Sequence, residues 1–112
     1  MESFLIKGGR PLCGEVTISG SKNAALPILA ATLLTQETCV IRRVPDLSDT
    51  RFMVQILQSL GATAKLENGT LTVCARKIKG FADYDLVRKM RGSICIAGPL
   101  LARLQSHDMF LI

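Results

Sequence analysis

The chain has 112 residues, enough for one modest domain that buries roughly two-thirds of the surface its unfolded form exposes. Its net charge of +5 suits an anionic ligand, but four Phe, one Tyr and no Trp give few stacking platforms for single-stranded nucleic acid. The longest uncharged apolar stretch, residues 24–34, is shorter than the roughly 20 residues that cross a membrane, and no secretion signal opens the chain. These features predict a soluble, cytoplasmic protein with neither nucleic acid nor a membrane as its partner.

The cysteines and the high apolar content bear on metals and partners. No CxxC pair occurs among Cys13, Cys39, Cys74 and Cys95, and His107 is the single histidine, so a zinc site at the usual ligand spacing is not expected. We expect reduced, buried thiols, because free Cys in apolar stretches behaves as a small hydrophobe. Hydrophobic residues make up 48% of the chain, which indicates apolar surface that contacts a partner, another domain or further chain.

Two short strands are predicted before the first helix. Residues 3–6 and 14–19 are rich in apolar residues, and in the second segment Val16 and Ile18 alternate with polar neighbours. A Ser-Gly-Ser turn follows, and residues 22–34 then form a predicted helix that is apolar on almost every side. We expect such a helix to be deeply buried.

The next segments complete one supersecondary unit. Asn68-Gly69 is the pair preferred in a two-residue hairpin turn, and Gly61 is a typical stop after a helix. From residue 14 to residue 75 the predicted order is β-α-β-α-β-β, one complete α/β unit. The segments that follow the first helix are a strand, a helix and a hairpin, at 39–44, 48–60 and 63–75.

A third helix is predicted over residues 83–104. Val87 and Met90 begin an apolar stripe whose members are three and four residues apart, which is typical of a helix face turned to a core. A strand is predicted at 108–112. We therefore interpret residues 83–112 as the start of a second unit that breaks off, which is not how an independent domain ends.

Lys22 occupies an unusual place for a lysine. It opens the first predicted helix, where the unpaired backbone N–H groups carry partial positive charge and acidic residues are the usual choice. A strand, a glycine turn and a helix N-terminus together make an anion site, and a bound phosphate would be attracted by Lys22 and by the N–H groups. The alternative is a solvated lysine, with Asn23 beside it as an ordinary polar residue.

Arg91 is the second candidate. On the third predicted helix it lies at the boundary of the apolar stripe, where an arginine can lay its stem on the core and present its guanidinium to a carboxylate or phosphate. Gly92 would let a ligand approach the backbone, and Cys95 shares the same side of the helix. The alternative is a plain surface arginine. We interpret the other basic residues of strand ends and helix faces as solvated: Arg42, Arg43, Arg51, Arg88, Lys89 and Arg103.

Three stretches carry a resemblance to a known family. "GEVTISGSKNAALPILAATLL", "VPDLSDTRFMVQILQSLGA" and "YDLVRKMRGSICIAGPLLARL" closely resemble the N-terminal part of the UDP-N-acetylglucosamine 1-carboxyvinyltransferases. These bacterial enolpyruvyl transferases carry out the first committed step of peptidoglycan synthesis. The similarity runs from Phe4 to Ile112, about a quarter of the family's usual chain.

The resemblance implies a fold and a set of binding residues. The fold is part of an inside-out α/β barrel made of βαβαββ units. Lys22 and Asn23 match the positions that line the phosphoenolpyruvate site, and Arg91 matches the arginine that contacts the UDP-sugar. The proton donor, usually Cys and sometimes Asp, is expected beyond Ile112, so no catalytic residue lies within the chain. No metal and no cofactor are implied.

The implied reaction is addition followed by elimination between two small-molecule substrates. The 3-hydroxyl of UDP-N-acetylglucosamine attacks C2 of phosphoenolpyruvate, C3 takes a proton, and the tetrahedral intermediate expels phosphate. Relatives often carry Ala and Trp where this chain has Gly92 and Cys95, so the wall beside the nucleotide is expected to differ. Because the remainder of the enzyme chain must complete the site, we expect this chain to be inactive alone.

Two alternatives remain open from the sequence. One is a fragment of the sister enolpyruvyl transferase that acts on shikimate 3-phosphate, although its Ser-Lys is usually followed by Ser rather than by Asn23. The other is a non-catalytic module that binds anions or nucleic acid. The leading interpretation implies a cytoplasmic transferase of cell wall biogenesis, and hence a role in cell shape, the cell cycle and cell division.

Overall fold

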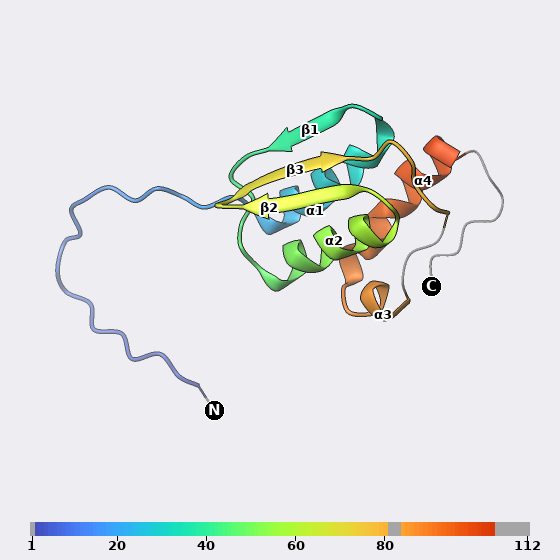
Figure 1. Cartoon of the computed structure of the whole chain (residues 1–112). Coiled ribbons are helices and arrows are strands. Elements are labelled where there is room, and N and C mark those ends of the chain that lie inside the picture. Colours follow the sequence, from blue (N-terminus) through green and yellow to red (C-terminus); the bar gives the residue numbers. More distant parts are fainter. Residues whose placement is uncertain (1, 81–83, 105–112) are drawn as a thin grey trace.

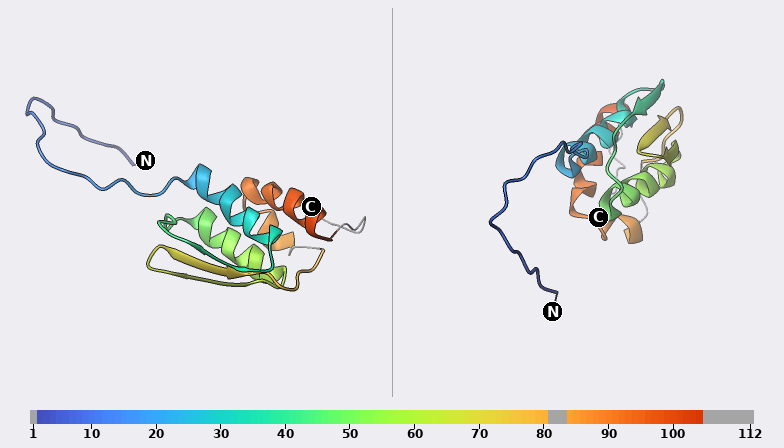
Figure 2. Two further views of the ribbon diagram at one scale, coloured as in Figure 1. Left: turned by 90° about the horizontal axis from the view of Figure 1, so that it is seen from above. Right: turned by 90° about the vertical axis from the view of Figure 1, so that its left-hand side faces the viewer.

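The computed structural model describes residues 2–80 and 84–104, which form a sheet covered on one face by helices. Figures 1 and 2 show the two layers, with the strands on one side and α1, α2 and α4 on the other. The elements in chain order are α1 Lys22–Ala31, the 3-10 helix η1 Thr32–Leu34, β1 Thr38–Ile41, α2 Ser48–Ser59, β2 Thr63–Glu67, β3 Thr70–Cys74, α3 Tyr84–Val87, the 3-10 helix η2 Arg91–Ile96, and α4 Ala97–Leu104.

The sheet has three strands in the order β1-β3-β2, and both pairings are antiparallel. Leu71 of β3 lies opposite Ile41 of β1 and Leu66 of β2. The hairpin between β2 and β3 turns at Asn68 and Gly69, whose φ angles of 50° and 76° are the positive values that such a two-residue turn requires. The predicted hairpin is confirmed.

The core lies between the sheet and the helices. Helix α2 turns Met53, Ile56 and Leu57 inward, and none of the three has exposed surface. Burying one such side chain contributes about 1.5–3 kcal/mol. Helix α2 ends at Ser59, just before Gly61 with a φ of 102°, so the predicted helix at 48–60 is confirmed. The other large side chains of the core with no or almost no exposure come from α1, η1, β3, η2 and α4 and from the end of α2: Leu29, Leu33, Leu60, Leu71, Val73, Ile96 and Leu100.

The predicted helix at 22–34 is confirmed as α1 followed by η1, but it is not buried on all sides. Leu26 and Leu29 face the core, whereas Ile28 is 46% exposed. Helix α1 packs on both α2 and η2, and the part of its surface that includes Ile28 stays exposed within the described chain (Figure 2).

The predicted strands at 3–6 and 14–19 are wrong for this structure. Residues 2–19 run as an extended arm that leaves the body (Figure 1), and no strand is formed there. The alternating pattern predicts a strand correctly only when a neighbouring strand supplies hydrogen bonds, and the described residues provide none. Phe4 is 96% exposed and Val16 is 86% exposed, so the arm presents apolar surface.

The predicted helix at 83–104 is also wrong as one element. It is divided into α3, η2 and α4, because Met90 adopts an extended conformation with φ −143° and ψ 123°. Ser93, which is buried, stabilises the break by donating a hydrogen bond from Oγ to the Val87 carbonyl oxygen at 3.1 Å. The strand predicted at 108–112 lies outside the described residues.

Arg103 of α4 is not the solvated residue that the sequence suggested. Its Nη1 donates to the carbonyl oxygens of Leu33 at 2.7 Å and Thr35 at 3.1 Å. Its Nη2 donates to those of Ala75 at 2.5 Å and Arg76 at 2.9 Å. One guanidinium therefore joins α4 to the end of η1 and to the segment after β3.

We predict that Arg103→Lys lowers the free energy of unfolding by about 1–3 kcal/mol, because a single ammonium cannot reach both pairs of carbonyl oxygens. Urea unfolding checks this value. Arg42→Lys is the matched control, since Arg42 is exposed just after β1. Equal stability of the two variants would contradict a stabilising role of the Arg103 hydrogen bonds.

Candidate functional site

The turn before α1 is pressed onto the segment that joins β1 to α2. A Cβ atom added to Gly20 would overlap the carbonyl oxygen of Arg43 and would lie 3.1 Å from Cδ of Pro45. The Arg43 guanidinium donates from Nη2 to the carbonyl oxygen of Ile18 at 2.7 Å. Ser21 caps α1, since its Oγ accepts from the backbone N–H of Ala24 at 3.4 Å. The start of α1 is thus held by the segment at Arg43 and Pro45 and by the Ser21 cap.

Lys22 has a partner in a neighbouring helix. Its Nζ lies 3.1 Å from Oδ2 of Asp49, which belongs to the first turn of α2. The two side chains are 47% and 29% exposed. The carboxylate is well placed at a helix N-terminus and offsets the charge of the lysine, which opposes the dipole of α1. Lys22 is therefore half exposed and paired with a carboxylate of the neighbouring helix.

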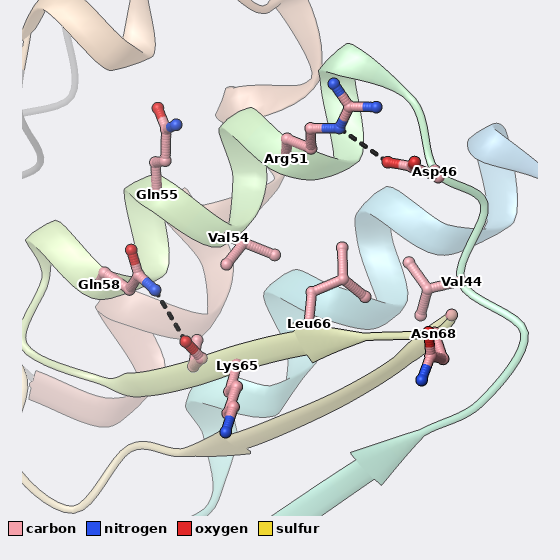
Figure 3. A pocket seen from close by; sticks show the side chains of 11 residues that line it. Val44, Asp46, Arg51, Val54, Gln55, Gln58, Lys65, Leu66 and Asn68 are labelled. Carbon is pink, nitrogen blue, oxygen red and sulfur yellow. Dashed lines mark hydrogen bonds and ion pairs between the residues drawn. The ribbon is translucent and has the colours of Figure 1, made fainter.

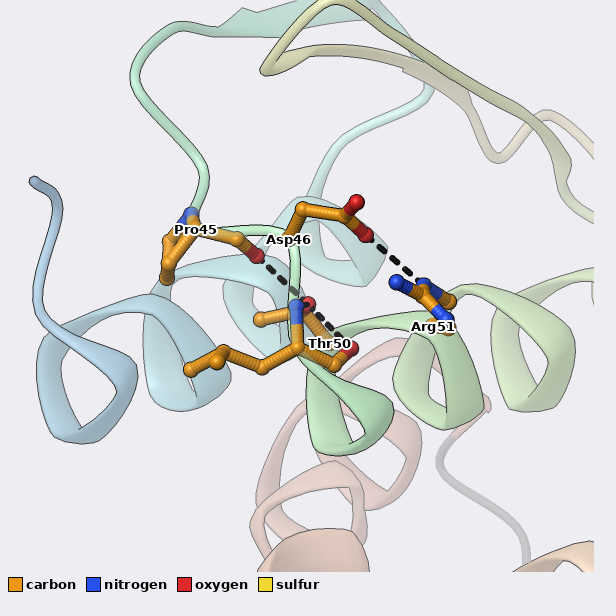
Figure 4. Close-up of polar contacts among 5 residues, drawn as sticks. Pro45, Asp46, Thr50 and Arg51 are labelled. Carbon is orange, nitrogen blue, oxygen red and sulfur yellow. Dashed lines mark hydrogen bonds and ion pairs between the residues drawn. The ribbon is translucent and has the colours of Figure 1, made fainter.

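The first turn of α2, which carries Asp49, is fixed by the fully buried Thr50 (Figure 4). Its hydroxyl lies 2.6 Å from the carbonyl oxygen of Pro45, to which it donates. The Thr50 hydroxyl oxygen in turn accepts a hydrogen bond from the backbone N–H of Leu47 at 3.1 Å. Asp49 lies in the chain between Leu47 and Thr50, which this hydrogen bond joins, so its backbone has a defined position.

A second ion pair lies at the same end of α2 but is local. Asp46 Oδ1 and Arg51 Nε are 2.7 Å apart, and both side chains are largely exposed (Figure 4). The hydrogen bond and the positive charge of Arg51 lower the pKa of Asp46 below its ordinary value. An exposed pair of this kind contributes little to stability.

Asn23 and Arg91 are both exposed, and each lies near the start of α1. Arg91 opens η2, and the next residue, Gly92, packs on α1, where its added Cβ would lie 2.8 Å from Cδ1 of Leu26. Leu26 is one helical turn beyond Lys22. The structure therefore brings the segments of Lys22 and Arg91 side by side.

Two pockets flank this region without being lined by Lys22, Asn23 or Arg91. A smaller one, of about 280 Å³, lies beside the Ser-Gly-Ser turn and includes Arg42 and Arg43 in its wall. A larger one, of about 660 Å³, lies between α2 and the hairpin (Figure 3). The predicted binding residues therefore stand on an open surface of the described chain.

The described residues, 2–80 and 84–104, carry neither a metal-binding cluster nor a membrane-spanning helix. There, no group of His, Cys, Asp or Glu side chains is arranged to hold a metal ion, and no helix has the length and apolarity to span a bilayer. The four cysteines are free. The expectation of buried thiols is wrong for Cys13, which is exposed on the arm, while Cys39, Cys74 and Cys95 are partly buried.

The comparisons with known proteins place the chain in a family. It belongs to the EPSP synthase (3-phosphoshikimate 1-carboxyvinyltransferase) family, whose pattern matches residues 6–112. It is 64% identical over 103 residues to the UDP-N-acetylglucosamine 1-carboxyvinyltransferase of Methylacidiphilum infernorum, an alignment that covers 92% of this chain and 24% of the relative. The enzyme of the same name from Akkermansia muciniphila is 58% identical over 105 residues, with 94% and 25% covered. The chain thus spans about a quarter of the length of these curated relatives.

A solved structure supports the same assignment. The enolpyruvyl transferase NikO from Streptomyces tendae matches with a TM-score of 0.73 and 29% identity, over 86% of this chain and 23% of that one. The predicted fold class, an α/β part of an enolpyruvyl transferase, is confirmed.

We predict that Gly20→Ala lowers the free energy of unfolding by about 1–3 kcal/mol, because the methyl group must displace the backbone at Arg43. Thermal or urea unfolding measures the change. Gly8→Ala is the control, since nothing lies within 4 Å of a Cβ at that position. A Gly20→Ala variant as stable as this control would show that the turn is not pressed onto Arg43.

Proposed function

We propose that this chain is the N-terminal part of an enolpyruvyl transferase that moves the enolpyruvyl group from phosphoenolpyruvate to the 3-hydroxyl of UDP-N-acetylglucosamine. The observation that carries the proposal is the 64% identity over 92% of the chain to a relative named for that activity. The sister activity on shikimate 3-phosphate is less well supported, because the relatives described above are named for the UDP-sugar and Asn23 follows Lys22.

In this function Lys22 and Asn23 bind phosphoenolpyruvate, and Arg91 binds UDP-N-acetylglucosamine. The position of Lys22 at the N-terminal turn of α1 supports the first role, because its ammonium and the unpaired backbone N–H groups attract the same phosphate. The exposure of Arg91 next to α1 supports the second. Lys22, Asn23 and Arg91 bind the substrates, and none of the three exchanges a proton in the reaction.

The chemistry is an addition followed by an elimination. The sugar 3-hydroxyl attacks C2 of phosphoenolpyruvate, C3 takes a proton from a donor beyond Ile112, and the tetrahedral intermediate releases phosphate. Lys22 balances the phosphate charge during binding and departure, an electrostatic role that contributes strongly in many enzymes. The chain requires no cofactor and no metal for these steps.

The rest of the enzyme chain completes the site, and these 112 residues alone are inactive. The exposed apolar side chains of the arm support this part of the proposal, because Phe4, Leu5 and Ile6 are each at least 85% exposed. In the complete enzyme, we expect residues 14–75 to form the first βαβαββ unit and residues 83–112 to begin a second. The first strand, at 14–19, would then form by pairing with chain outside the described residues.

The product commits UDP-N-acetylglucosamine to peptidoglycan, so the enzyme acts in cell wall biogenesis and supports cell shape and division. Both substrates are water-soluble anions of the cytoplasm, where we place the protein. A net charge of +5 suits such anions and requires neither nucleic acid nor a membrane as partner.

In the complete enzyme, we predict that Lys22→Ala lowers kcat/KM for phosphoenolpyruvate roughly tenfold or more, since a charged hydrogen bond is worth about 1.5–3 kcal/mol. Steady-state kinetics at saturating UDP-sugar checks this loss. Lys65→Ala is the matched control, because Lys65 is an exposed lysine paired with Glu67 on the sheet. Unchanged kinetics in Lys22→Ala would remove Lys22 from the site.

Arg91→Ala in the same enzyme is predicted to raise the KM for UDP-N-acetylglucosamine by about tenfold, through the loss of a charge-assisted contact. The KM for phosphoenolpyruvate should change much less. Arg88→Ala serves as control, since Arg88 contacts only its neighbours Asp85 and Tyr84 among the interactions recorded for it. Equal values for Arg91→Ala and the unsubstituted enzyme would make Arg91 a surface residue.

A further inference from the structure

The ion pair between Lys22 and Asp49 differs from the other recorded pairs in what it connects. Three pairs join residues within five positions of each other, at Asp46–Arg51, Lys65–Glu67 and Asp85–Arg88. Lys22 and Asp49 belong to different helices and are 3.1 Å apart. Their side chains are also the least exposed of the eight, at 47% and 29%. This pair therefore joins the N-terminal turns of α1 and α2.

Both partners stand on backbone that has little freedom to move. The turn before Lys22 is pressed onto the Arg43 carbonyl through Gly20. The turn around Asp49 is held by the buried hydroxyl of Thr50. The remaining freedom lies in the lysine side chain, whose flexible four-carbon stem has many rotamers in water. The carboxylate of Asp49 selects the rotamers that keep the ammonium above the start of α1.

We propose that Asp49 is a positioning residue that holds the Lys22 ammonium in place for the phosphate group of phosphoenolpyruvate; this inference rests on the proposed function. An ammonium has three N–H donors, and Asp49 uses one of them, so donors remain for a phosphate. Because the side chain is already ordered before substrate arrives, less conformational entropy is lost on binding. No proton is transferred by Asp49.

A carboxylate near a phosphate also repels it, and this effect opposes the proposal. The repulsion is reduced here because Asp49 lies in the first turn of α2, where the helix dipole carries partial positive charge. The pairing with Lys22 neutralises the carboxylate further. We therefore expect the loss of order to outweigh the relief of repulsion when Asp49 is neutralised.

A double-mutant cycle in the complete enzyme tests the proposal. We expect Asp49→Asn to lower kcat/KM for phosphoenolpyruvate about five- to tenfold, and Asp49→Glu to restore part of it. In the Lys22→Ala background, Asp49→Asn should have no further effect, because the group that it positions is gone. A lowered KM in Asp49→Asn, or an equal loss with and without Lys22, would overturn the proposal.

Two controls separate positioning from general effects. Asp46→Asn also removes one negative charge near the start of α2 but breaks only the exposed pair with Arg51, so it should leave kcat/KM unchanged. The ¹⁵N signal of the Lys22 ammonium reports the pair directly, and Asp49→Asn should accelerate its hydrogen exchange. An ammonium signal indifferent to Asp49→Asn would overturn the proposal without involving activity.

Failure of the proposed function gives a different result. If the unsubstituted complete enzyme does not turn over phosphoenolpyruvate with UDP-N-acetylglucosamine, the proposed function is wrong and the role of Asp49 falls with it. If turnover is normal and Lys22→Ala is impaired, but the cycle shows no coupling, only the role of Asp49 is wrong. Thermal unfolding of every variant identifies any loss that comes from misfolding.

Discussion

The packing of α1 beside α2 on a three-stranded sheet is the constraint on which the other features depend. Leu29 of α1 belongs to the same buried cluster as Met53, Ile56 and Leu57 of α2, and the two helices pack with their N-terminal turns close together. The segment between β1 and α2 also contacts the turn before α1. It therefore determines the position of the start of both helices relative to the sheet. A hydrophobic contact thus decides where two polar helix ends meet.

That meeting gives Lys22 an electrostatic setting that neither helix would provide alone. The lysine opposes the dipole of its own helix, while Asp49 is favoured by the dipole of α2 and compensates the lysine. The half-exposed ammonium remains accessible to an anion. The pairing with Asp49 stabilises Lys22 without a bound ligand and leaves its side chain half exposed, which supports the proposed role of Lys22 in binding phosphate.

The sequence predicts the elements that are determined locally. The hairpin follows from Asn68-Gly69 and the end of α2 from Gly61, since both need positive φ angles that glycine or asparagine adopts readily. The segments 3–6 and 14–19 are predicted as strands but form none in the structure, because a strand needs a partner strand that the local pattern does not identify. The break at Met90 depends on the buried hydroxyl of Ser93, which periodicity ignores.

In the candidate site, too, the sequence reveals what is determined locally but not what depends on distant contacts. Lys22 stands out in the sequence because a lysine at a helix N-terminus is unusual, but its partner lies 27 positions later in "DLSDT" and only the packing of α1 on α2 reveals it. Arg103 is a comparable case. Its four hydrogen bonds to the described residues all go to main-chain oxygens, so they depend on the path of the backbone and not on which side chains stand at those positions. These hydrogen bonds place no demand on the side chains of Thr35 and Arg76, whereas those of Leu33 and Ala75 are constrained separately, because both are buried in the core.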